Sequence, residues 1–266
     1  MAVTSFIPKL WSARLQANLQ MSLVFGALAN RNYEGEIAQY GDTVHINSIE
    51  DITVKPYSPN TDIADPEQLT TADKTLVIDH GVYFNFYLND VDAAQARGDL
   101  MDAAMANASY KLAENTENYL ASVILAAGEI TGNVDAAKAY ESIVAIKTAM
   151  DTANVPKEGR KLVVPPSIEG AMLLDDRFIT GSKGEGRLEN GAIARAAGFD
   201  IYISNAEGMD SKIVAFRSDD FTFANQITHI EAYRREKGFD DGVKGLSLCG
   251  AKVTRPEAVA VYTIGA

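Results

Sequence analysis

The stretch that decides the fold is DKTLVIDHGVYFNFYLND, residues 73–90. Apolar side chains recur at every second position of this stretch, a pattern typical of a β-strand with one apolar face. The alternating positions are Leu76, Ile78, Val82, Phe84, Phe86 and Leu88. A single strand over residues 75–88 would be roughly 45 Å long at about 3.3 Å per residue, whereas typical strands hold about 5–6 residues. The sequence therefore predicts an unusually long strand.

A second strand precedes the first and has the same alternation. It begins with TVHINSI, residues 43–49, and the pattern continues to Tyr57. Residues 58–74 between the two strands are polar and contain two prolines. Residues 43–88 are thus predicted to form a two-stranded ribbon with a wide polar tip. A ribbon of two strands is marginally stable by itself, so it must lie on another surface.

A long helix is predicted after the ribbon. Alanine is abundant there, no proline occurs between Pro66 and Pro156, and apolar residues keep helical spacing over residues 99–127. Gly128 is a natural stop. This helix would be about 43 Å long, while a compact chain of this length has a diameter near 48 Å. Ribbon and helix would each cross the whole body, which indicates that other copies of the chain cover them.

The remaining segments alternate between helix and strand patterns. Helices are expected over 135–156 and 167–179, and short strands over 160–167, 199–205 and 212–218. Longer strand patterns follow residue 219 and are expected to be antiparallel and to pack on the long helix. The fold class predicted is α+β.

Composition limits the classes of partner. Thirty-six acidic against 24 basic residues give a net charge of −12, and no basic cluster longer than YRREK, residues 233–237, occurs. Such a surface is unsuited to gripping nucleic acid, although ordinary acidic solubility explains the charge equally well. No apolar run approaches the ~20 residues of a membrane span, so we expect no membrane partner. Cys249 is the only cysteine, which excludes an internal disulfide.

Residues that could carry chemistry are few. His45, His80 and His229 lie in strand patterns without metal-ligand spacing, and Cys249 is expected to be a buried, inert thiol. The loop GSKGEGRLENG, residues 181–191, lacks the order of a phosphate-binding loop. Three acidic doublets fall at expected turns or helix ends, where Asp is common. They are Asp175-Asp176, Asp219-Asp220 and Asp240-Asp241. We therefore expect no catalytic residue, no metal and no cofactor, and not an enzyme.

Several stretches resemble one family, the major capsid (coat) proteins of tailed bacteriophages with the Hong Kong 97 bacteriophage-type fold. They follow the family's order along essentially the whole chain. The stretches are SFIPKLWSARLQANL (5–19), VFGALANRNYEGEIAQYGDTVHINSI (24–49), DVDAAQ (90–95), KLVVPPSIEGAML (161–173) and GFDIYISNAEG (198–208). The N-terminal stretches are the most specific part of the resemblance.

The resemblance implies a division of the chain into parts. Residues 1–42 would be an N-terminal arm, and 43–88 an extended β-hairpin loop that lies over a neighbouring subunit. Residues 89–129, which contain the spine helix, would form the peripheral domain together with 220–266. Residues 130–219 would form the axial domain. With 266 residues, we expect neither an inserted extra domain nor a long cleavable scaffolding segment within this chain.

The implied function is structural. Pentamers and hexamers of the chain would close into an icosahedral head in the bacterial host cytoplasm and enclose double-stranded DNA without binding it specifically. Portal and possible scaffolding or decoration proteins would be further partners of the virion. Subunit contacts are expected at Phe6, Trp11, Tyr57, Asp62, Asp65, Glu67 and Phe84, with the acids of the ribbon tip seeking basic residues on a neighbour. Phe84 is expected either between subunits or at the ribbon root. The alternatives are an encapsulin-like compartment shell and, from a different class, a small-molecule-binding enzyme using the 181–191 loop.

Overall fold

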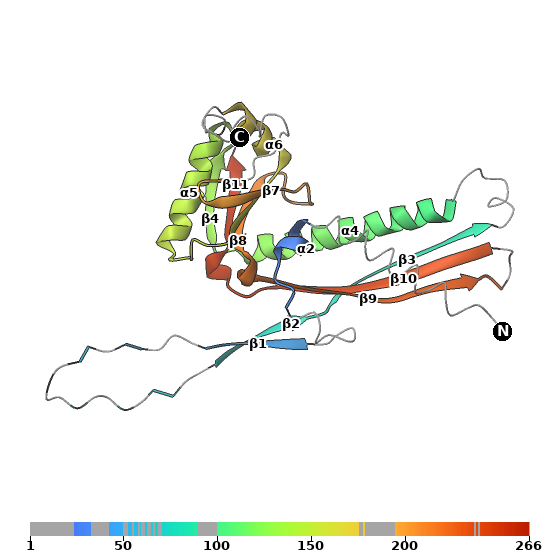
Figure 1. Cartoon of the computed structure of the whole chain (residues 1–266), viewed down its shortest axis with the longest axis horizontal. Coiled ribbons are helices and arrows are strands. Elements are labelled where there is room, and N and C mark those ends of the chain that lie inside the picture. The colour runs from blue at the N-terminus through green and yellow to red at the C-terminus, as the bar shows by residue number, and fades with distance from the viewer. Residues whose placement is uncertain are drawn as a thin grey trace.

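The molecule is elongated, with a ribbon that projects far from the rest (Figure 1). The computed structural model describes residues 24–32, 43–49, 53–54, 56–57, 59, 62, 65, 67–68, 71–89, 100–175, 178, 195–236, 238 and 240–265. On the side opposite the ribbon, a long helix lies along a three-stranded sheet, and a six-stranded sheet with two helices stands above their junction. The predicted α+β class is confirmed.

The long helix α4, Leu100–Ala127, matches the predicted helix to within one residue. At 1.5 Å per residue its 28 residues span about 42 Å. Its buried side chains recur at helical spacing and form one stripe, which is what an amphipathic helix buries. Gly128 follows the helix for a reason other than a left-handed cap. A Cβ there would lie 2.4 Å from Cγ2 of Val261, so close packing requires glycine.

The stripe of α4 packs on a three-stranded antiparallel sheet. The strand order is β3 (His80–Asn89), β10 (Asp240–Val253) and β9 (Phe221–Arg234), with a β-bulge opposite Leu246 and Ser247. Exposure alternates along β3 as the sequence pattern predicts. Phe84 and Phe86 point toward the helix and join a core that includes Leu120, Ile124 and Phe223.

The predicted single strand over 75–88 is wrong, because the chain leaves strand geometry at Ile78 and Asp79. Strand β1 (Thr43–Ile49) pairs only with β2 (Thr71–Val77), whereas β3 pairs with β10. The two-stranded ribbon therefore covers residues 43–77 rather than 43–88. Alternation with a period of two shows which face of a strand is apolar, but it does not show which strand is the partner.

The six-stranded sheet has the order β4-β11-β8-β5-β7-β6. Helices α5 (Ala139–Thr152) and α6 (Pro166–Leu174) contribute side chains to a second core with this sheet. Other residues of the same strands join the core of α4, so β5 and β8 are almost continuously buried, as expected of strands covered on both faces. The strands are β4 (Ile130–Asp135), β11 (Ala260–Gly265), β8 (Lys212–Arg217), β5 (Arg160–Val164), β7 (Phe199–Ile203) and β6 (Arg195–Ala196).

The C-terminal strand differs from the expectation that residues 220–266 complete one antiparallel sheet on the long helix. β11 leaves the three-stranded sheet and pairs with β4 in parallel and with β8 in antiparallel orientation. Among the described residues, three short 3₁₀ helices connect elements: η2 (Ala136–Lys138), η3 (Ser218–Asp220) and η4 (Pro256–Ala258). Through η3 and η4, the chain passes from one sheet to the other twice.

A short N-terminal helix, α2 (Val24–Leu28), is fixed at the junction of the two sheets. Immediately after it, Asn30 forms a parallel bridge with Thr222 of β9. The Asn30 amide donates to the carbonyl of Phe221, and the Phe223 amide donates to the carbonyl of Asn30. The ammonium group of Lys161 donates to the Leu28 carbonyl. This segment is thus held by strand-type hydrogen bonds.

Candidate assembly surfaces

The ribbon carries exposed apolar side chains at the end far from the cores. Its strands pair from Thr43 opposite Val77 to Ile49 opposite Thr71 and lead away from the three-stranded and six-stranded sheets (Figure 1). Val54 is 92% exposed and Tyr57 is 73% exposed. Both lie outside the buried clusters of the described part of the chain. These side chains are available to another molecule.

The predicted acidic residues of the tip are exposed. Asp62 and Asp65 both face solvent. The Glu67 carboxylate accepts hydrogen bonds from Thr53, at 3.2 Å from its backbone nitrogen and 3.3 Å from its hydroxyl. Glu67 therefore joins the two sides of the tip within one subunit, and Asp62 and Asp65 stay candidates for contacts with a neighbour.

The apolar residues predicted for subunit contacts lie in different places. Phe84 is half-buried in the core of its own subunit, where its ring stacks on Phe86 with centroids 5.9 Å apart. It lies in β3, beyond the ribbon root, so the described contacts of Phe84 are within the subunit. Phe6 and Trp11 lie outside the described residues.

The ribbon root crosses the face of the three-stranded sheet that points away from α4. Leu76 and Ile78 pack there with Ala224 and Leu248 in a small separate cluster. Gly250 makes this crossing possible, because a Cβ at that position would lie 2.3 Å from the carbonyl oxygen of Val77. The ammonium group of Lys74 also donates to the Thr254 carbonyl. The sheet thus anchors the ribbon on one face.

Asp79 and His80, which follow the ribbon root, contact α4 on the opposite face of the three-stranded sheet. The Tyr119 hydroxyl of α4 donates to the Asp79 carboxylate at 3.0 Å. The His80 ring stacks on the Tyr119 ring at 4.1 Å, and its Nε2 lies 2.8 Å from Oδ1 of Asn115. Burial and the bond to Asp79 raise the pKa of Tyr119, so the hydroxyl keeps its proton. Residues 76–80 therefore fix the ribbon against both faces of the sheet.

We expect Tyr119→Phe to weaken this attachment while keeping the ring stack. The variant removes the hydroxyl that donates to Asp79, and the loss of one such hydrogen bond lowers the free energy of unfolding by about 1 kcal/mol. Urea denaturation measures the change. Tyr110→Phe is the matched control, since Tyr110 is an exposed tyrosine of the same helix and should change the free energy by less than about 0.5 kcal/mol. Equal effects of the two substitutions would contradict the attachment.

A patch of tyrosines covers the outer face of the three-stranded sheet and was missed by sequence reasoning. Tyr83 is 76% exposed and Tyr87 is 58% exposed. The Arg235 guanidinium lies 4.5 Å from the centre of the Tyr87 ring, and the Tyr233 hydroxyl donates to Asn85 at 2.7 Å. The available signal was the set of positions between the apolar ones in β3, where tyrosines stand instead of charged residues.

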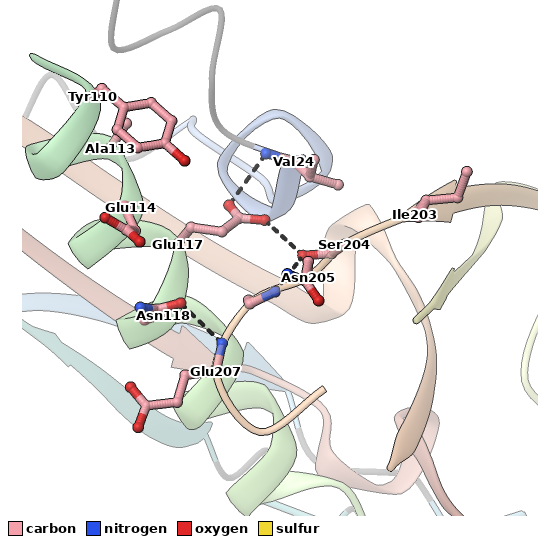
Figure 2. Close-up of a pocket in the computed structure, with 11 residues that line it drawn as sticks. Val24, Tyr110, Ala113, Glu114, Glu117, Asn118, Ile203, Ser204, Asn205 and Glu207 are labelled. Carbon is pink, nitrogen blue, oxygen red and sulfur yellow. Dashed lines mark hydrogen bonds between the residues drawn. The ribbon is translucent and has the colours of Figure 1, made fainter. Parts of the chain in front are cut away.

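A cavity of about 410 Å³ lies where α2, α4 and the loop after β7 meet (Figure 2). The Glu117 carboxylate, on a residue only 9% exposed, occupies its wall. It accepts hydrogen bonds from the amides of Val24 and Phe25 and from the Ser204 hydroxyl. Burial raises the pKa of Glu117 against the opposing effect of these bonds. The rest of the wall comprises Tyr110, Ala113, Glu114, Asn118, Ile203, Asn205, Ala206 and Glu207.

Comparison with known protein families decides the identity of the chain. A family model described as phage capsid protein matches residues 71–263, from the second strand of the ribbon almost to the end of β11. The chain belongs to this family. It is a capsid shell protein, a structural component of the virion, and capsid proteins act by associating with further copies of themselves.

Solved structures support the same conclusion. A chain from Mycobacterium phage Che8 is 28% identical, with a TM-score of 0.78 over 90% of each chain. The capsid structure of Cyanophage P-SCSP1u gives 16% identity and a TM-score of 0.74, covering 91% of this chain and 88% of that one. A virus-like particle from Pyrococcus furiosus gives 14% identity and a TM-score of 0.65, covering 95% of this chain and 97% of that one. No curated protein matches significantly. The capsid protein has the Hong Kong 97-type fold.

Three residues of the capsid protein that were considered for chemistry, Cys249, Asp220 and Asp240, are buried within the subunit. Burial raises the pKa of the Cys249 thiol to about 12, which agrees with an inert cysteine. Asp220 is fully buried, with the Arg255 guanidinium 3.7 Å away, and burial raises its pKa. Asp240 accepts from Asn89 at 2.7 Å. The side chains of His45 and His229 and the 181–191 loop lie outside the described residues.

The described residues of the capsid protein lack features that membrane crossing and metal binding require. None of its described helices combines the length and the apolar character that crossing a bilayer requires. Within the same residues, no three His, Cys, Asp or Glu side chains are grouped as metal ligands.

Proposed function

We propose that this capsid protein assembles through pentamers and hexamers into the icosahedral head of a tailed phage, in the cytoplasm of the bacterial host, and encloses double-stranded DNA. The single observation that carries the proposal is the ribbon. Beyond the root that packs on the three-stranded sheet, its described residues include exposed Val54 and Tyr57, which lie outside the buried clusters. Apolar side chains in such a place gain stability only when another molecule covers them.

The partner of the ribbon is proposed to be a neighbouring copy. Its tip carries Asp62 and Asp65, while the outer face of the three-stranded sheet carries Arg235 and Lys244 beside its tyrosines, each with an acidic partner in its own subunit. Opposite charges favour this pairing and fix its register more than its strength. Tyr57 would then bury its ring on the neighbour. Phe6 and Trp11 are proposed for contacts of the arm.

The proposed division into parts follows the fold, with the ribbon shortened. Residues 1–42 would serve as an arm and 43–77 as the extended loop. Residues 80–129 and 220–253 would form the peripheral domain, and 130–219 with the C-terminal strand the axial domain around the five- and six-fold centres. Portal, scaffolding and decoration proteins are further proposed partners of the head.

The packaged DNA is proposed to be enclosed without specific binding. The net charge of −12 repels a polyphosphate, so the shell would leave the DNA free to move during packaging. The proposed function has no catalytic step. Titratable side chains such as Glu117 and Asp220 would have structural roles, consistent with their burial inside the subunit.

An encapsulin-like compartment is the second candidate, favoured by the fold similarity to the Pyrococcus furiosus particle at 14% identity. Such a shell would enclose a protein instead of DNA. The two candidates share the subunit fold and differ in their contents.

Imaging of the purified protein tests both candidates. We expect negative-stain micrographs of the overproduced chain to show closed icosahedral particles or capsomers, and material from infected cells to contain nuclease-protected DNA. A stoichiometric protein cargo without DNA would favour the compartment. A monomer at micromolar concentration that forms no particle, even with co-produced scaffolding protein, would contradict both.

A further inference from the structure

One carboxylate joins three parts of the subunit that are far apart in sequence. Glu117 lies near the middle of α4, and its Oε2 is 3.1 Å from the amide nitrogens of both Val24 and Phe25. Its Oε1 is 3.2 Å from the Phe25 nitrogen and 3.2 Å from the Ser204 hydroxyl. Figure 2 shows the side chain reaching from α4 toward α2 and the loop after β7.

The helix that Glu117 holds cannot form without outside support. α2 has five residues, and helices of this length are unstable alone because nucleation costs more than one turn returns. Its first amide groups have no partner within the helix, so the carboxylate supplies the missing acceptor and a favourable negative charge. The structure of α2 therefore depends on Glu117 at one end.

The other end of α2 is fixed by unrelated contacts. Phe25, in the first turn, also contributes a fully buried ring that stacks on Phe216 with centroids 6.4 Å apart. Asn30 pairs with β9, and Lys161 binds the carbonyl of Leu28. With the C-terminal end held on the sheet and the Phe25 ring buried, Glu117 is the group that binds the backbone amides of the first turn.

Holding a helix with a buried carboxylate carries an unfavourable desolvation free energy. Taking its charge out of water opposes folding, and apolar packing in the same place would stabilise the subunit as well or better. The hydrogen bonds offset this cost only while all three partners are present. Such an arrangement favours a single geometry over maximum stability, and that geometry concerns where the N-terminal segment leaves the body.

We propose that Glu117 is the positioning residue that fixes the exit of the N-terminal arm, and that shell assembly requires it. This inference deepens the proposed function and rests on it for the assembly step. Through Ser204, the same carboxylate couples the arm to the loop after β7, so the arm and the six-stranded sheet keep a defined relation along α4.

The test compares Glu117→Gln with Glu114→Gln. Glutamine retains the shape and one acceptor oxygen but removes the charge. Glu114 lines the same cavity from the same helix, is exposed, and pairs with Lys111. Hydrogen exchange of the 24–30 segment is the primary measurement, with exchange in α4 and β9 and the urea midpoint read in parallel.

We expect Glu117→Gln to speed exchange at Val24 and Phe25 at least tenfold, to leave α4 and β9 protected and the urea midpoint unchanged, and to lower the yield of closed particles about tenfold. Glu114→Gln should match the wild type in all measurements. Unchanged exchange at 24–30, or a uniform rise across the subunit with a lower urea midpoint, would overturn the positioning role.

A second variant covers the case in which Glu117→Gln does not fold. Ser204→Ala removes one donor and leaves the charge and both amide contacts, so exchange at 24–30 should rise less than tenfold but measurably. No change in exchange there would count against the proposal. The exchange result is independent of particles, so a wild type that forms none would contradict the proposed function while the positioning of the arm is still decided by exchange.

Discussion

Replacing residues 50–70 by an Asn-Gly turn is expected to leave a subunit that folds normally and forms no closed shells. Ile49 and Thr71 pair directly at the end of the ribbon, and Asn-Gly is the preferred two-residue connection for such a hairpin. The described residues of the deleted segment contribute nothing to the buried clusters, so the free energy of unfolding should change little. The variant lacks Val54, Tyr57 and the acidic tip.

Electron microscopy and sedimentation velocity check this prediction, and circular dichroism checks the fold. We expect the yield of closed particles to fall at least tenfold, with capsomers or monomers in their place. A double variant, Val54→Ser with Tyr57→Ser, keeps the length of the ribbon and removes these two apolar side chains. It therefore distinguishes the effect of ribbon length from the effect of apolar contacts. Normal particles from the shortened chain would show that the ribbon has no part in the lattice.

Gly250→Ala is expected to dislodge the ribbon root. The added Cβ would lie 2.3 Å from the Val77 carbonyl oxygen and 2.8 Å from Cδ1 of Ile78. The first of these atoms is backbone, so a rotamer change cannot relieve the clash and either β10 or the ribbon must move. Leu76 and Ile78 would then lose their packing on Leu248. Overpacking of this kind costs about 1–3 kcal/mol, and we expect the upper end together with a complete loss of regular shells.

Thermal or urea unfolding measures the stability change, and micrographs measure the assembly defect. Gly170→Ala in α6 is the control, since nothing lies within 4 Å of its added Cβ. In an exposed helical position that substitution should stabilise the subunit by about 0.5–1 kcal/mol and leave assembly intact. If Gly250→Ala formed normal shells at normal stability, the crossing of the ribbon over β10 would not be a constraint.

The long helix could be predicted from the sequence, because α4 has many turns of consistent spacing, and the α+β class could be predicted with it. The interruption at Ile78 and Asp79 could not, because the alternation continues unchanged while the partner strand changes from β1 to β10. The position of β11 was also unpredictable, since pairing with β4 depends on contacts between segments more than 120 residues apart, Ile130 and Ala260 among them.

Local signals were misleading at some boundaries. Asparagine before an alanine-rich segment is a typical helix cap, yet Asn89 ends β3 and donates to Asp240. Serine is likewise a typical cap, but Ser167 lies inside α6, whose capping position is Pro165 with Pro166 in the first turn. Proline at the start of a helix needs no side-chain cap, because its missing amide would be unpaired in any case.

The candidate surfaces were predictable only in part. The exposed ribbon tip with Tyr57, Asp62 and Asp65 follows from a polar segment between two alternating strands. Glu117 could not be identified, because one glutamate in a helix with many polar residues looks like part of a solvated face. Its burial arises from α2 and the 204–207 loop, which reach it only in the folded subunit.

The pairing of β3 with β10 has a mechanical consequence. A pull by a proposed neighbour on the ribbon would enter the body at the ribbon root, residues 74–80, and continue along β3, whose register runs from His80 opposite Cys249 to Asn89 opposite Asp240. Hydrogen bonds between antiparallel strands lie perpendicular to the strands, so this tension loads them in shear, all together, instead of opening them one after another. A shell whose subunits were joined through these ribbons would therefore resist outward pressure, because all the hydrogen bonds between β3 and β10 would have to break at once.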